Sequence, residues 1–244
     1  MMNVIAILGG KGGTGKSTCS IGLGIALASQ GKRVLLIDMD AGMRCLDMLM
    51  GVSEKLLFDV SDAVAGRELS TCILSVPKYS GLYLLAAPSE KELVDVTAFG
   101  EFISQLNQDE WDTVIIDLPA GTDKELYASF PVHTKFVCVC NPNAVSVRDA
   151  EITANILRSV SRKGKLIINK FEPYFIKNAV FDSIDDIIDR CGLTLLGIVP
   201  DSEQLALAFL TGKFPARGKA ARAFSRIAKR LDSKDVKLPK LKKI

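Results

Sequence analysis

A glycine-rich segment near the N-terminus holds the residues whose types and spacing point most directly to chemistry. It reads Gly9-Gly10-Lys11-Gly12-Gly13-Thr14-Gly15-Lys16-Ser17-Thr18 and, from Gly10 onward, satisfies the pattern G-x-x-x-x-G-K-[ST]. Glycines let such a loop curl so that successive backbone N–H groups point at phosphate oxygens. In this pattern Lys16 bridges β- and γ-phosphates, and the hydroxyl of Ser17 binds Mg²⁺. The segment therefore predicts a nucleoside triphosphate site over Gly10–Thr18.

The sequence around this loop predicts a strand before it and a helix after it. Apolar residues fill Asn3–Leu8, and a helical pattern follows over Ser17–Gln30. The start of that helix would add the positive end of its dipole to the phosphate site. A second apolar run, Val114-Ile115-Ile116-Asp117, matches a Walker B strand, in which Asp117 holds the hydration shell of Mg²⁺.

The additional lysine at position 11 gives the loop the form K-G-G-T-G-K-S-T, which resembles the MinD/ParA family of nucleotide-dependent ATPases. The resemblance extends over nearly the whole chain and is closest to the MinD branch. It implies ATP or ADP with Mg²⁺ as ligands. It also implies that Lys11 reaches across a dimer interface to the partner's phosphates, as an arginine finger does.

The run Val34-Leu35-Leu36-Ile37-Asp38-Met39-Asp40 is similar to the acidic strand end of that family. A strand over Arg33–Ile37 should lie near the first strand, so that its terminal carboxylates face the phosphates. The resemblance implies that Asp38 orders Mg²⁺ through water and that Asp40 orients the attacking water. The implied catalytic residues are then Lys11, Lys16 and Asp40, and the implied metal site is Ser17, Asp38 and Asp117.

Three further segments resemble parts of the family's nucleotide site. The residues after Asp117 look like its second switch, in which the amide of Gly121 senses the γ-phosphate. Asn169 ends a run that resembles the family's adenine-reading strand, and Pro200-Asp201 looks like the segment that closes over the base. These features favour ATP over GTP, because Asn169-Lys170 is not continued into the guanine motif N-K-x-D.

The segment from Asn143 to Glu151 has two interpretations of equal weight. It resembles a family segment that opens a helix at the dimer or partner face. It also fits a simple capped helix, with Asn143 or Ser146 as the N-cap.

Short apolar runs alternate with longer helical patterns along the 244 residues, of which 48% are hydrophobic and 24% charged. Most of the runs are apolar on both faces, as parallel strands covered by helices are. The predicted strands are Asn3–Leu8, Arg33–Ile37, Leu82–Ala86, Thr113–Asp117, Lys135–Cys140, Lys165–Ile168 and Thr194–Val199. The predicted helices are Ser17–Gln30, Lys91–Asn107, Ser146–Arg162, Ser183–Cys191 and Lys219–Leu231. This pattern predicts an α/β fold with a doubly wound, mostly parallel sheet flanked by helices.

The composition excludes several classes of protein. His133 is the single histidine, which argues against triad, zinc or histidine acid–base chemistry. The six cysteines form no C-x-x-C pair, and Cys138 and Cys140 alternate like one face of a buried strand. We expect free thiols in a reducing cytoplasm. The N-terminus lacks a basic signal-peptide region, and the uncharged stretch Ser17–Gly31 is too short and polar to span a bilayer.

The charge is unevenly distributed along the chain. From Lys213 to the end there are 12 basic and 2 acidic residues, whereas the preceding part has a net charge of −7. We expect one ATPase domain over residues 1–232, its last helix packed on the body, and a flexible basic tail over 233–244. The tail lysines, Lys234, Lys237, Lys240, Lys242 and Lys243, suit an anionic membrane surface or DNA. Pro239 argues against a helix there, and a purely solubilising tail remains an alternative.

These features together predict a slow ATPase that acts as a dimerising switch in spatial positioning, most plausibly of the division site. Stimulation by a regulatory protein and a location in the cytoplasm or at the inner face of the membrane follow from the resemblance. The alternatives are a DNA-partition ATPase, a flagellar-number regulator, an adaptor that binds ATP without turnover, and an iron–sulfur carrier on the same scaffold. The last would require cysteines that bridge a dimer.

Overall fold

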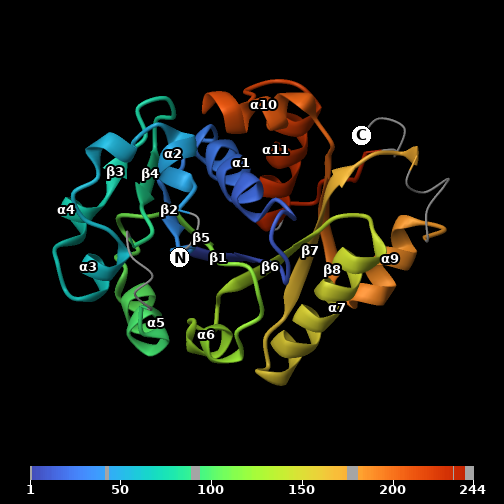
Figure 1. Cartoon of the computed structure of the whole chain (residues 1–244), viewed down its shortest axis with the longest axis horizontal. Helices are drawn as coiled ribbons and strands as arrows, with labels where there is room; N and C mark the ends of the chain where they lie inside the picture. The colour runs from blue at the N-terminus through green and yellow to red at the C-terminus, as the bar shows by residue number, and fades with distance from the viewer. Residues whose placement is uncertain (1, 42–43, 89–93, 175–180, 233, 240–244) are drawn as a thin grey trace.

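The computed structural model describes residues 2–41, 44–88, 94–174, 181–232 and 234–239. Its centre is an eight-stranded sheet with helices on both faces (Figure 1). The strands are β1 (Asn3–Leu8), β2 (Val34–Asp38), β3 (Leu74–Ser75), β4 (Leu82–Leu85), β5 (Thr113–Asp117), β6 (Lys135–Cys140), β7 (Gly164–Phe171) and β8 (Thr194–Pro200). They lie in the order β3-β4-β2-β5-β1-β6-β7-β8, and β3 alone of these strands is antiparallel to its neighbour. The predicted fold class is confirmed.

The helices divide between the two faces of the sheet (Figure 1). On one face lie α1 (Lys16–Ala28), α2 (Leu46–Met50), α10 (Glu203–Thr211) and α11 (Lys219–Leu231). The other face carries α3 (Val60–Val64), α4 (Leu69–Cys72), α5 (Val96–Gln105), α6 (Lys124–Ser129), α7 (Ala144–Ser159) and α9 (Ile184–Cys191). A short 3₁₀ helix, η1 (Ser53–Lys55), follows α2.

The strands are apolar on both sides because each side packs under a helical layer. In β1, Ile5 and Ile7 pack toward α1, whereas Val4, Ala6 and Leu8 belong to the opposite core. The predicted alternation in β6 is also confirmed, since Cys138 and Cys140 are both fully buried in one core.

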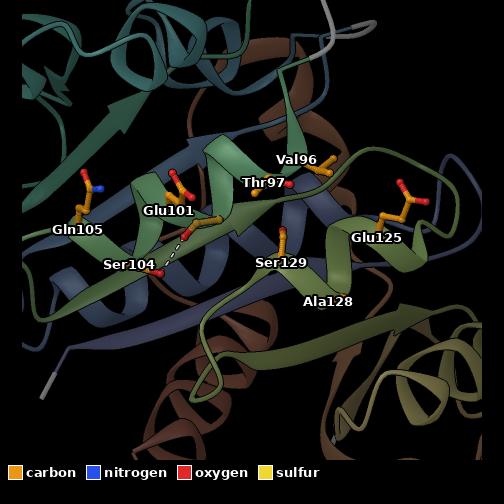
Figure 2. Close-up of a pocket in the computed structure, with 9 residues that line it drawn as sticks. Val96, Thr97, Glu101, Ser104, Gln105, Glu125, Ala128 and Ser129 are labelled. Atoms are coloured by element: carbon orange, nitrogen blue, oxygen red, sulfur yellow. Dashed lines mark hydrogen bonds between the residues drawn. The ribbon is translucent and has the colours of Figure 1, made fainter.

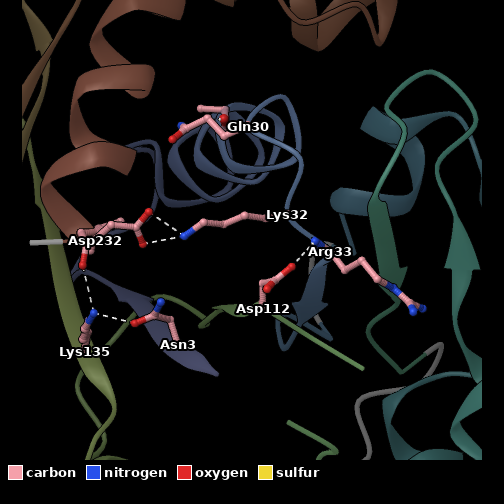
Figure 3. Close-up of polar contacts among 9 residues, drawn as sticks. Asn3, Gln30, Lys32, Arg33, Asp112, Lys135 and Asp232 are labelled. Carbon is pink, nitrogen blue, oxygen red and sulfur yellow. Dashed lines mark hydrogen bonds and ion pairs between the residues drawn. The ribbon is translucent and has the colours of Figure 1, made fainter. Parts of the chain in front are cut away.

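The last helix packs on the body, as predicted. The residues of its apolar face are all buried: Ala220, Ala223, Phe224, Ile227, Ala228 and Leu231. The ring of Phe224 lies so close over Gly22 that a Cβ there would come within 2.4 Å of it. The end of α11 is held by polar contacts at the amino ends of the strands (Figure 3). Lys32 Nζ lies 2.6 Å from the carboxylate of Asp232, and Lys135 donates to the Leu231 carbonyl and to Asn3 Oδ1.

Several helix boundaries differ from the predictions. The helix expected from Ser146 begins at Ala144, because Asn143 is its N-cap and accepts a hydrogen bond from the Ser146 amide at 2.9 Å. The helix expected over Lys91–Asn107 is found over Val96–Gln105, where Asp95 caps its start. Lys91 lies outside the described residues. The helices α2, α3, α4, α6 and α10 were not predicted.

Part of the predicted basic tail also lies outside the described residues, namely Lys240, Lys242 and Lys243. Among the residues that the structure does describe, no helix combines the length and the hydrophobicity needed to cross a membrane.

Candidate functional site

The phosphate loop predicted from the sequence joins β1 to α1 at the carboxyl edge of the sheet. Its residues Gly13 and Gly15 have φ angles of 78° and 96°, in the region that favours glycine. Gly15 is the N-cap of α1, so the free amides of the first helical turn face the loop. Lys16 follows at the first helical position, and only 7% of its surface is exposed.

The loop opens onto a cavity of about 620 Å³. Ten of the predicted site residues line it: Gly12, Gly13, Gly15, Lys16, Ser17, Thr18, Asp40, Asn169, Pro200 and Asp201. Sequence reasoning missed six others: Cys45, Ala120, Lys170, Ser202, Leu205 and Ala206. Cys45, which precedes α2, and the residues at the start of α10 carry no recognisable sequence signal, because only folding brings these distant segments to the loop.

Two buried carboxylates stand beside this cavity at the ends of neighbouring strands. Asp38 of β2 is in register with Asp117 of β5, and each is 1% exposed. Asp117 accepts a hydrogen bond from Ser20 Oγ at 2.9 Å and another from the Ser17 hydroxyl. Helix α1 therefore presents two hydroxyls to this carboxylate.

Burial raises the pKa of both carboxyl groups. The pKa of Asp117 rises to about 7, mainly through desolvation and with a contribution from the nearby Asp38 charge, against hydrogen bonds from Ser17 and Ser20. Desolvation raises the pKa of Asp38 to about 6, although the amides of Asp40 and Leu46 donate to it at 2.9 and 3.1 Å. A cation bound beside these groups would favour their ionised forms and lower both pKa values.

The donor set fits Mg²⁺, a hard cation that prefers oxygen ligands. The described residues contain no cluster of three or more acidic, histidine or cysteine side chains that would hold a metal unaided. This agrees with the usual Mg²⁺ site of a phosphate loop, in which substrate phosphates and water supply most ligands. Ser17 would be the direct protein ligand, with Asp38 and Asp117 acting through water.

The end of β7 also contributes to the cavity wall. Asn169 is 3% exposed, and its amide nitrogen donates to the Thr14 carbonyl of the phosphate loop at 2.8 Å. Lys170 Nζ donates to the carbonyl of Gly13 at 3.1 Å. The residue predicted to read adenine therefore also holds the loop.

Six predicted residues contribute around the cavity without lining it: Gly10, Lys11, Thr14, Asp38, Asp117 and Gly121. Lys11 is exposed, and its carbonyl accepts from the Thr14 hydroxyl at 3.5 Å. The amide of Gly121 donates to the Gly9 carbonyl at 3.4 Å, which ties the segment after β5 to the loop. Thr14 is buried and contacts Asn169 through its carbonyl.

A second hollow of about 620 Å³ lies between α5 and α6 (Figure 2). It is lined by none of the predicted site residues. The helices approach closely there, since a Cβ on Gly100 would lie 2.4 Å from the Ser129 carbonyl. Its polar side chains are those of Thr97, Glu101, Ser104, Gln105, Glu125 and Ser129.

The cysteines give no support to an iron–sulfur site. Five of the six are buried, and the sixth, Cys45, is partly exposed at the nucleotide cavity. A cluster shared between two subunits needs thiols at a surface, which Cys138 and Cys140 do not provide.

Fold and site together define a phosphate-loop nucleotide-binding protein. Residues 5–216 match the family described as the CobQ/CobB/MinD/ParA nucleotide binding domain, so the chain belongs to this family. The septum site-determining protein MinD of Bacillus subtilis (strain 168) is 33% identical, over 98% of this chain and 92% of its own length. The MinD protein of Helicobacter pylori is 31% identical, over 99% and 95%.

Solved structures show the same relationship. The MinC:MinD cell division protein complex of Aquifex aeolicus contains a chain that superposes with a TM-score of 0.87 at 29% identity, covering 98% of both chains. MinD of Pyrococcus horikoshii, complexed with Mg-ADP, gives a TM-score of 0.81 at 26% identity, over 95% of this chain and 96% of its own.

Proposed function

We propose that this protein is an ATP-driven switch that dimerises with ATP and Mg²⁺, is released by hydrolysis, and places the division site. The observation that carries the proposal is the phosphate loop with two lysines beside the register pair Asp38 and Asp117. The similarity to septum site-determining MinD proteins over nearly full length supports the biological role.

Each part of the loop has a task in binding the triphosphate. The loop amides and the start of α1 would hold the phosphate oxygens, and Lys16 would neutralise β- and γ-phosphate charge. Bound Mg²⁺ would supply further charge neutralisation between these phosphates. Asn169, Pro200 and Asp201 also line the cavity and would hold the base.

Hydrolysis would depend on positioning and charge rather than on a strong base. Asp40 lines the cavity and would orient water toward the γ-phosphate. Lys11 is an exposed residue of the loop, where a second copy of the chain can contact it. Two copies facing each other would each lend Lys11 to the other's phosphates, and the charge that builds up in the transition state would be stabilised across the interface.

The ATP-bound dimer would bind a regulatory protein and a membrane surface. The MinC:MinD complex of Aquifex aeolicus supports a regulatory protein as partner, and we propose that such a partner stimulates turnover. The basic C-terminal region would hold the dimer at the inner face of the cytoplasmic membrane.

The experiment is phosphate release from ATP with and without Mg²⁺, in wild type and in Asp40→Ala. We expect Mg²⁺-dependent turnover that falls about 100-fold or more in the variant, since water is no longer oriented. The variant should also accumulate as an ATP-bound dimer. The exposed Asp109→Ala serves as the control and should turn over normally. Unchanged phosphate release by Asp40→Ala would remove this residue from the mechanism.

A further inference from the structure

Two successive side chains at the end of β7 hold two successive carbonyls of the phosphate loop. Asn169 donates to Thr14 at 2.8 Å, and Lys170 donates to Gly13 at 3.1 Å. We call this pair of contacts the β7 clamp. Lys170 also lines the nucleotide cavity, although the sequence motifs assign it no role.

An ordinary strand could not make both contacts. Successive side chains of a strand point to opposite faces of the sheet, so two neighbours do not normally reach the same loop. Lys170 avoids this because its φ angle is 51°, in the left-handed region that is uncommon for any residue with a Cβ. The register between β7 and β8 also shifts between Ile168 and Phe171. The strained backbone therefore lies at the residue that contacts the loop, as strained residues often do at functional sites.

The loop is shaped to receive the clamp. A Cβ on Gly15 would lie only 2.1 Å from the amide nitrogen of Asn169, so glycine is required there for the side chain to approach. Asn169 is almost fully buried, whereas Lys170 is exposed and keeps its ammonium group in solvent beside the cavity.

The clamp fixes the direction of the loop amides. A peptide unit is planar, with its N–H opposite its C=O, so holding the carbonyls of Gly13 and Thr14 also aims the N–H groups of Thr14 and Gly15 away from β7. Loop amides that already point toward the phosphate site bind phosphate with a smaller loss of conformational entropy.

We propose that Lys170 is a positioning residue for the phosphate loop, acting through the Gly13 carbonyl. Its positive charge adds a second, salt-sensitive attraction for the anionic nucleotide. This inference rests on the proposed function only in taking the loop's ligand to be ATP or ADP.

The first test measures the loop without nucleotide. We would record ¹⁵N relaxation of the Thr14 and Gly15 amides in wild type, Lys170→Met, Lys170→Gly and Lys170→Arg. The wild type and Lys170→Arg should give order parameters of about 0.85. Those of Lys170→Met and Lys170→Gly should fall below about 0.6. The glycine variant relieves the backbone strain, so its loss of order would not reflect general destabilisation. Lys163→Met, an exposed lysine just before the same strand, is the control. Unchanged order in both Lys170→Met and Lys170→Gly overturns the proposal.

The second test separates positioning from charge by calorimetric titration of ADP at low and high salt. We expect Lys170→Met to weaken ADP binding about tenfold, the effect of one modest hydrogen bond, with most of the loss persisting at 1 M salt. A loss that disappears at 1 M salt would make Lys170 a charge only and would overturn the positioning role. If the loop loosens in the variants but wild type binds neither ADP nor ATP, the clamp stands and the proposed function fails.

Discussion

At the scale of single residues, the site places two acidic side chains next to each other in a buried position. Asp38 and Asp117 lie side by side at the ends of β2 and β5, and burial raises the pKa of both well above that of an exposed carboxyl group. Such an arrangement destabilises the empty fold near neutral pH in order to favour a ligand that brings positive charge.

The pH dependence of stability tests this directly. Because the folded-state pKa of Asp117 is raised to about 7, the folded protein holds a proton there that the unfolded chain has lost. The stabilising contribution is therefore complete below the unfolded pKa and is lost as the pH rises through about 7. We expect Asp117→Asn to raise the thermal midpoint of the nucleotide-free protein clearly at pH 8 and much less at pH 5. The exposed Asp109→Asn should show no such difference, and an equal effect of Asp117→Asn at both pH values would contradict the account.

The residues that could be predicted from the sequence are those with a local signature. Lys16, Ser17 and Asp117 belong to compact motifs whose spacing alone gives their place. Ser20 and Lys170 could not be found in this way. Ser20 contacts a carboxylate 97 positions away, and the reach of Lys170 depends on one irregular φ angle that no residue pattern announces.

At the scale of elements, the length of each strand or helix decided whether it could be predicted. Each of the seven predicted strands is present with its ends within a few residues, because buried parallel strands are unbroken apolar runs. The two-residue strand β3 and the short helix α2 escaped prediction, because so few residues show no periodicity. The end of β7 was predicted too early, since the polar residues Asn169 and Lys170 interrupt the apolar run.

The contact between α1 and α11 supports the helix that carries the phosphate loop. Phe224 is 3% exposed and packs on Gly22 of α1. We expect Phe224→Ala to lower the free energy of unfolding by about 3–5 kcal/mol, the usual cost of such a cavity. Urea unfolding would measure this loss. Arg222→Ala, on the exposed side of the same helix, should cost less than about 0.5 kcal/mol, and a comparable loss in both variants would mean that α11 is not seated by its apolar face.

At the scale of the whole molecule, the phosphate loop and the end of α11 lie at opposite edges of the sheet. The phosphate loop follows the carboxyl end of β1, whereas the root of the tail is held at the amino ends of β1 and β6 by Lys32 and Lys135 (Figure 3).

Co-sedimentation with anionic liposomes and with DNA tests the role of the tail, using the full chain and a chain truncated after Asp232. The five tail lysines should each contribute on the order of 1 kcal/mol near an anionic lipid surface. We expect the full chain to pellet with liposomes when ATP is present and the truncated chain to stay in solution. Pelleting of the full chain with DNA instead would favour a partition ATPase, and equal pelleting of both chains would show that the tail is not the anchor.

The central claim is that ATP joins two copies through Lys11, and the mass of the protein with a non-hydrolysable ATP analogue and Mg²⁺ tests it. Size-exclusion chromatography with light scattering should give a dimer for the wild type and for the distant control Lys55→Ala, but a monomer for Lys11→Ala. Titration of ADP should show that Lys11→Ala keeps most of its affinity, because Lys11 serves the partner's phosphates. A dimer of unchanged stability in Lys11→Ala, or a wild type that remains monomeric with the analogue, would contradict the account.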